Sequence, residues 1–149
     1  MIAFIIFLIY ITLATYKNNG IPESLSATYY LWEHKFIFPL VISIIGILLL
    51  PEWLDATDGS NFQFIPFLAC GGLMFISTVP DYKNDEGQFK IHMALAYLIT
   101  GLSLLYLLKN WYLFPIIFVL SCLFDLKNFR KNYVYHIEYA LILSIIISL

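Results

Sequence analysis

The stretch Phe36–Leu50 reads FIFPLVISIIGILLL and contains no charged residue. Five other apolar runs lie along the chain. The six runs are residues 2–16, 36–50, 62–79, 91–108, 111–124 and 133–149. Apolar runs of this length, separated by short polar segments, are typical of membrane-spanning helices. The pattern predicts an all-α fold: one domain, a polytopic bundle of about six short transmembrane helices.

The composition supports this prediction. Of 149 residues, 61% are hydrophobic and only 12% are charged, where a soluble domain has roughly 25% charged residues. The mean hydropathy is +0.83. A small soluble domain leaves much of its surface exposed and could not hide so many apolar side chains, whereas a bilayer solvates them. No basic run or basic helix is present, which argues against nucleic-acid binding.

The predicted spans are short. A run of 14–18 residues reaches only about 21–27 Å at 1.5 Å per residue, less than the ~30 Å hydrocarbon core of a typical bilayer. Aromatic residues near the ends of the runs and a locally thinner bilayer would make up the difference.

The distribution of basic residues sets the orientation and the number of spans. With six spans, one side holds seven of the eight Lys and Arg residues: Lys17, Lys35, Lys83, Lys90, Lys127, Arg130 and Lys131. The other side holds only Lys109. Without a span at 111–124, the two sides would hold four each. Cytoplasmic loops carry the excess of Lys and Arg, so we expect six spans, with both termini outside.

The segments between the runs are predicted to be loops. Residues 51–61 form an acidic outside loop, and residues 80–90 form a cytoplasmic one. Residues 22–35 are less polar, and Pro22 and Glu23 suit the first turn of a helix. We expect residues 22–35 to be a helical entry into the second span that lies in or near the cytoplasmic interface.

Polar side chains are predicted to gather at the cytoplasmic ends of the spans, where all three histidines fall. Ionisable residues at membrane depth suggest function. His136, Ala140, Ser144 and Ser148 recur every fourth residue, so their side chains share one face of a helix, which we expect to face protein. Glu138 lies on the other side of this helix, and we expect it to reach the interface or pair with Lys131 or Arg130.

Three histidines and a carboxylate can form a zinc site. His34, His92 and His136 are the candidate metal ligands. Asp81 and Ser77, one turn before it, are the candidate catalytic residues. Asp81 or Asp125 could be a further ligand, a residue that orients a ligand, or the general base. Catalytic zinc often keeps three protein ligands and activates a bound water. The chain contains no HExxH or other short-range pair of ligands, so the prediction depends on the topology bringing these residues together.

A serine, an aspartate and three histidines at one end of a helix bundle resemble the CREST group of membrane hydrolases, the alkaline-ceramidase-like proteins. The matching residues are Ser77, Asp81, His92, His34 and His136. The resemblance implies a zinc ion at these residues and hydrolysis of a lipid amide. That family has about seven spans and a paired histidine motif on its last helix, where this chain has His136 alone.

Three functions follow from these observations. The first is a structural or partner-binding membrane subunit, associated with the lipid bilayer and with itself or another membrane protein. The second is a membrane-embedded, zinc-dependent lipid hydrolase. The third is a proton or ion pathway, which the near absence of ionisable residues in the outer halves of the spans disfavours. The composition and the charge distribution suggest a bacterial inner membrane.

Overall fold

A computed structural model describes residues 2–110, 112–126 and 128–149. These residues form α-helices and two short 3₁₀ helices, with no strand among them. In chain order the helices are α1 (Ile2–Lys17), η1 (Ser26–Leu31), α2 (Ile37–Ala56), α3 (Phe64–Ile76), α4 (Glu86–Leu107), η2 (Leu108–Asn110), α5 (Leu113–Leu123) and α6 (Phe129–Ser148). Each predicted span therefore corresponds to one α-helix. Trp111, where the sequence predicts the fifth span to begin, lies outside the described residues, as does Lys127.

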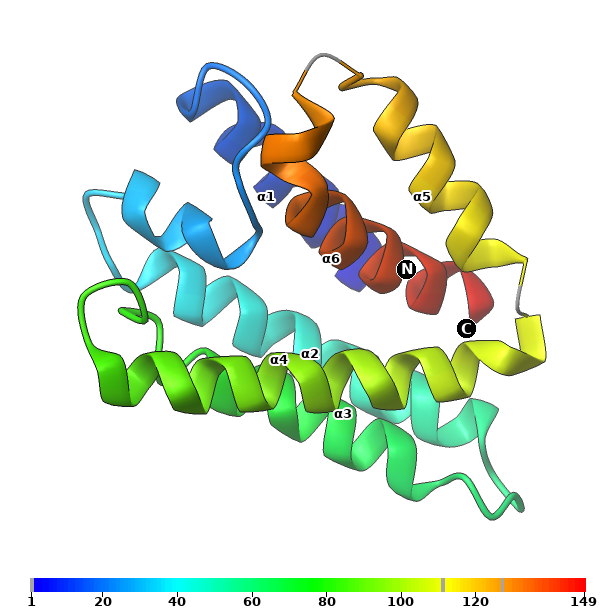
Figure 1. The fold of residues 1–149 in the computed structure, drawn as a ribbon. Helices are drawn as coiled ribbons and strands as arrows, with labels where there is room; N and C mark the ends of the chain where they lie inside the picture. The colour runs from blue at the N-terminus through cyan, green and yellow to red at the C-terminus, as the bar shows by residue number, and fades with distance from the viewer. Residues whose placement is uncertain (1, 111, 127) are drawn as a thin grey trace.

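The helices pack in two groups. α2, α3 and α4 lie side by side, and α5 packs on α6 (Figure 1). α1 contacts both α2 and α6, and α4 contacts α6, so these contacts join the two groups. Gly72 allows α3 to approach α4 closely: a Cβ at this position would lie 2.7 Å from Cγ1 of Ile99. A small residue at a helix interface has the same use in membrane bundles.

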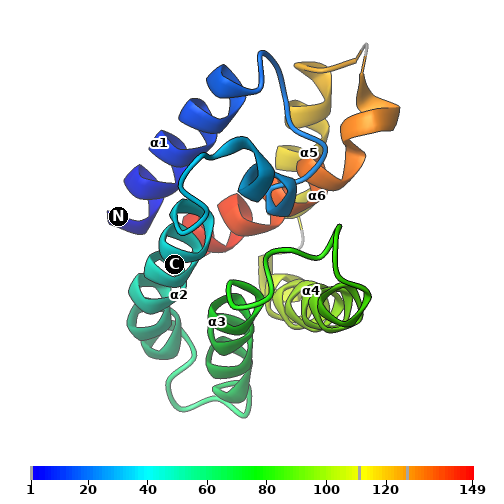
Figure 2. The ribbon, with the colours of Figure 1, turned by 90° about the vertical axis from the view of Figure 1, so that its left-hand side faces the viewer.

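The connections 18–36 and 77–85 lie at one end of the bundle, whereas the connection 57–63 lies at the other (Figures 1 and 2). Contacts between side chains agree with this arrangement. Glu23 bonds Lys83 at the first end, which we call the polar end, and Trp53 packs on Tyr106 near the second, with ring centroids 5.0 Å apart. Both chain termini lie toward the second end (Figure 1).

α2 is longer than predicted. The sequence analysis placed Pro51 in an outside loop, but α2 continues through it to Ala56. Proline removes one helical hydrogen bond, and burial beyond it offsets that loss: Trp53 is fully buried against α4. Burying an aromatic side chain of this size contributes about 2–3 kcal/mol, which holds the last turn of α2 in place.

α4 and α6 also begin earlier than predicted. The Asp85 carboxylate accepts the N–H of Gln88 at 2.8 Å, which satisfies one of the free donors in the first turn of α4. Glu86, the first residue of α4, adds a favourable negative charge at that N-terminus. The predicted loop 80–90 therefore ends at residue 85, and α6 begins at residue 129 rather than 133.

Residues 22–35 differ most from the prediction. Only Ser26–Leu31 is helical, as the 3₁₀ helix η1. Leu25 and Thr28 are 3% and 0% exposed, and the Thr28 hydroxyl bonds that of Tyr10 on α1. η1 is therefore packed against α1 and α2 at the polar end of the bundle. The N–H of Ser26 has its partner on α6, the Glu138 carboxylate, whereas the N–H groups of Ala27 and Thr28 bond Ser24 and Leu25 of the same segment.

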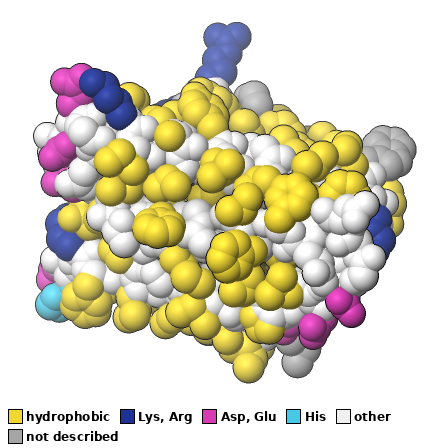
Figure 3. Space-filling view, turned by 90° about the horizontal axis from the view of Figure 1, so that it is seen from below, with side chains coloured by type: hydrophobic (Ala, Val, Ile, Leu, Met, Phe, Trp, Pro, Cys, Tyr) yellow, Lys and Arg dark blue, Asp and Glu magenta, His cyan; other side chains and the backbone are white. Residues whose placement is uncertain are grey.

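Much of the outer surface is apolar. Each α-helix carries large apolar side chains that are at least about half exposed, including Ile9 on α1, Phe67 on α3, Val119 on α5 and Ile147 on α6. Figure 3 shows one such face, with apolar side chains across its middle and most charged side chains toward its two edges. Two helical stretches, Ile37–Ala56 and Glu86–Asn110, are long and apolar enough to cross a membrane. α1, α3 and α5 are apolar but shorter.

Candidate functional site

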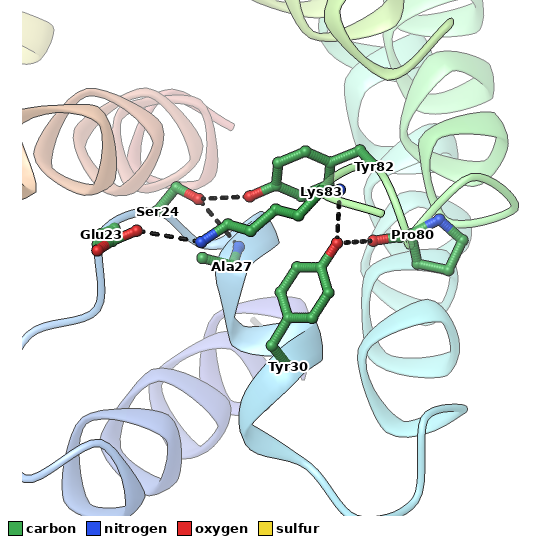
Figure 4. A network of polar contacts seen from close by, with 7 residues as sticks. All are labelled: Glu23, Ser24, Ala27, Tyr30, Pro80, Tyr82 and Lys83. Carbon is green, nitrogen blue, oxygen red and sulfur yellow. Dashed lines mark hydrogen bonds and ion pairs between the residues drawn. The ribbon is translucent and has the colours of Figure 1, made fainter. Parts of the chain in front are cut away.

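A network of polar contacts joins the segment before η1 to the loop between α3 and α4 (Figure 4). The Lys83 ammonium donates to the Glu23 carboxylate at 3.1 Å. The backbone N–H of Lys83 donates to the Tyr30 hydroxyl at 2.8 Å, which in turn donates to the Pro80 carbonyl at 3.5 Å. The Lys83 ammonium also lies over the Tyr30 ring, 5.4 Å from its centroid. These contacts fix the α3–α4 loop against η1.

The pKa values of the acidic groups in this network differ from their ordinary values. The hydrogen bond and the positive charge of Lys83 lower the pKa of Glu23 below its ordinary value. Burial raises the pKa of Tyr30 and of Tyr82, so both phenols stay neutral and can donate hydrogen bonds at physiological pH. Both members of the Glu23–Lys83 pair are about half exposed. Such a pair contributes at most about 1 kcal/mol.

His92 lies beneath this loop, in the second turn of α4. It is 3% exposed, and its ring stacks on that of Tyr82 with centroids 4.3 Å apart. Its Nδ1 lies 3.2 Å from the carbonyl oxygen of Val79. The Tyr82 hydroxyl lies 3.5 Å from that of Ser24. His92 therefore supports the loop through a ring stack and a backbone contact.

Glu138 is the ionisable residue nearest the middle of α6, and its position differs from the expectation. Its Oε2 accepts the N–H of Leu25 at 2.6 Å. The N–H and the hydroxyl of Ser26 are also hydrogen-bond partners. The carboxylate thus faces the first residues of η1 instead of Lys131, Arg130 or the interface. It also lines a cavity of about 60 Å³ between α2, α3, α4 and α6, whose other lining residues are mostly apolar.

The sequence analysis named Glu138 but missed this role. The signal was present: the residue stands nine positions into α6, and an ionisable side chain far from the ends of a predicted span suggests a specific partner. The segment 22–35 was expected to lie at the interface, so it was not considered as a source of N–H donors for this carboxylate. An ionisable side chain at such a depth calls for an internal partner.

His136 and Asp125 form a second polar contact, between α6 and the turn after α5. His136 Nε2 lies 3.5 Å from Asp125 Oδ2, and His136 is 1% exposed. The same carboxylate accepts from the side-chain amides of Asn132 at 2.7 Å and Asn128 at 3.2 Å. These bonds hold the turn that joins α5 to α6. Of the predicted stripe on α6, His136, Ala140 and Ser144 are buried in protein, whereas Ser148 is partly exposed.

The remaining predicted site residues have local partners. Ser77 is buried, with its hydroxyl 2.8 Å from that of Ser43. Asp81 accepts from the side-chain amide of Asn84 at 2.7 Å. His34 is exposed in the segment between η1 and α2, next to Phe36 with ring centroids 5.7 Å apart.

The structure does not gather the predicted zinc ligands. His34 lies on the surface at the polar end, His92 against Tyr82, and His136 against Asp125. Among the described residues, no group of three His, Cys, Asp or Glu side chains is placed to hold a metal ion. The polar end of the bundle exists as predicted, but its side chains pair with their neighbours in separate clusters.

Comparison of the chain with protein-family models, with curated proteins and with solved structures finds no match.

Proposed function

We propose that this chain is a polytopic membrane protein that acts as a structural, partner-binding subunit within the bilayer. The observation that carries the proposal is the exposure of large apolar side chains on every α-helix. A soluble monomer rarely exposes an apolar patch larger than a few hundred Å². Lipid tails and the helices of a membrane partner can cover such a surface without cost.

The positions of the charges support the same proposal. The described basic residues Lys17, Lys35, Lys83, Lys90, Arg130 and Lys131 belong to the polar end, and Lys109 belongs to the other. This bias matches the positive-inside rule and would place the polar end in the cytoplasm. A six-span arrangement would then put both termini outside.

The contacts of the candidate site residues support a structural role. Ser77, His92, Asp125 and Glu138 each bond a group on another helix or loop. Each contact joins two parts of the chain, and together they hold η1 and the loops of the polar end in place. A subunit that binds partners through its outer surface needs this internal rigidity.

Membrane integration is tested first by extracting membranes at alkaline pH. A polytopic protein stays in the membrane pellet, and release into the supernatant would contradict the proposal.

The orientation is tested with a membrane-impermeant maleimide on intact cells, in a Cys122→Ala background that leaves the buried Cys70 in place. We expect Asp58→Cys to be labelled, because its loop lies at the end opposite the polar network. Asn84→Cys, in the α3–α4 loop, should be labelled only after the cells are opened. The reverse pattern would overturn the orientation while leaving membrane integration standing.

A further inference from the structure

A groove runs along α6 between α1 and α5. These two helices lie on either side of α6 (Figures 1 and 2). The groove has a volume of about 510 Å³, within the range of ~300–1,000 Å³ for ligand-binding pockets. Most of its lining side chains are apolar: Ile11, Ile21, Ile117, Leu120, Phe124, Leu143 and Ile147, among others. Its polar lining groups include Thr15, Ser121 and His136.

α5 keeps the groove open. It packs extensively on α6 alone, and none of its residues is buried. The side of α5 that carries Ile117, Leu120 and Phe124 forms one wall of the groove, and Ile11 and Thr15 on α1 line the other side. The side chains that line an empty groove lack van der Waals partners on one side. A molecule from the surroundings should therefore occupy the groove.

The groove becomes more polar toward the polar end of the bundle. Ile11, Thr15 and Tyr135 line it and also line a second recess of about 540 Å³. That recess is completed by Thr12, Tyr16, Asn19 and Gly20 at the end of α1. The deep part of the groove thus offers aliphatic side chains, and the outer part offers hydroxyl, amide and backbone groups. This gradient along one continuous surface matches an amphiphile.

We propose that the groove holds one acyl chain of a membrane phospholipid. The chain would lie along Leu120, Leu143 and Ile147, and the ester and headgroup would lie in the recess beside Thr15 and Asn19. The lipid would come from the leaflet at the polar end. This inference rests on the proposed membrane location and adds to it a defined lipid site that is distinct from the general apolar surface.

The test is native mass spectrometry of the detergent-purified protein after incubation with phosphatidylcholine and, separately, with phosphatidylglycerol. Leu120→Trp fills the groove from a position that is 50% exposed. Leu123→Trp is the matched control: it lies on the same helix, is 56% exposed and is not among the lining residues. Thermal unfolding of both variants verifies that they fold.

We expect wild type and Leu123→Trp to retain one phospholipid, and Leu120→Trp to retain it at least about tenfold less well, a difference of ~1.4 kcal/mol. Both headgroups should bind, because the recess is lined by uncharged groups. Equal retention by all three proteins, or none by wild type, would overturn the proposal. A protein dimer that Leu120→Trp abolishes would also overturn it, by showing that a second copy occupies the groove. Release of wild type at alkaline pH would instead defeat the membrane proposal itself.

Discussion

Replacing Glu138 with leucine should loosen η1 from α6. The carboxylate accepts the N–H of Leu25 at 2.6 Å and has the N–H of Ser26 within reach. Leu25 and Ser26 are 3% and 7% exposed, so water cannot easily replace the lost acceptor. Leucine has nearly the same volume and fills the space without offering an oxygen atom. Two buried donors would then have no partner.

The expected cost follows from these two donors. A buried donor without an acceptor costs about 1–3 kcal/mol, so Glu138→Leu should lower the free energy of unfolding by about 3 kcal/mol. For a chain of this length, the unfolding temperature should fall by roughly 10 °C. Glu138→Gln keeps one acceptor oxygen and should cost only about 1 kcal/mol.

The assay is thermal unfolding in detergent, followed by circular dichroism, with limited proteolysis of the native protein. Glu138→Leu should unfold earlier and be cut within residues 20–35, whereas Glu138→Gln should be only slightly affected. Glu33→Leu is the control, because Glu33 is an exposed carboxylate just past the C-terminal end of η1. The reasoning is refuted if Glu138→Leu unfolds at the wild-type temperature and residues 20–35 stay protected.

Three further predictions concern the other polar contacts. Because Lys83 lowers the pKa of Glu23, their pair stabilises the fold above about pH 4.3, the pKa of a free glutamate. That contribution is lost as the pH falls through the lower pKa of Glu23 in the folded state. Glu23→Gln should remove this pH dependence of stability in acid titrations and lower the free energy of unfolding by less than about 1 kcal/mol at pH 7. Asp125→Ala should cost about 2 kcal/mol, because it leaves the side-chain amides of Asn132 and Asn128 without their acceptor; faster proteolysis between α5 and α6 checks this, and unchanged protection contradicts it. His34, His92 and His136 occupy three separate surroundings, so a metal chelator should leave the unfolding temperature unchanged. A lower unfolding temperature together with release of about one zinc ion per chain would restore the zinc hypothesis.

The sequence predicted the helices better than their ends. Long apolar runs between polar segments indicate helices directly, because only a helix satisfies its own backbone groups within an apolar run. The end of α2 was missed because Pro51 usually breaks a helix, and the burial of Trp53 against α4 is not visible in a local pattern. The start of α4 could have been found, since Asp85 and Gln88 are spaced as a helix cap.

The sequence did not predict the partners of the candidate site residues. The topology placed Asp81, His92 and Glu138 toward one end of the bundle. It could not show that His92 would stack on Tyr82, or that Glu138 would face Leu25. Those contacts depend on how residues 20–35 fold back into the bundle. A non-helical segment of this kind has no periodicity from which its neighbours can be read.

The contacts of η1 also set an order of events during synthesis. The residues around η1 emerge early, but their partners come much later: Tyr82 follows Ser24 by 58 positions, Lys83 follows Glu23 by 60, and Glu138 follows Leu25 by 113. Until α6 is made, the N–H of Leu25 lacks its acceptor. Residues 20–35 can contact Tyr10 of α1 early, but Glu138, their last partner, is made only after α2 to α5. A nascent chain that stalls before Glu138 would have most of its helices, but its connection 18–36 would stay accessible to proteases. Cleavage there would distinguish the incomplete chain from the finished protein.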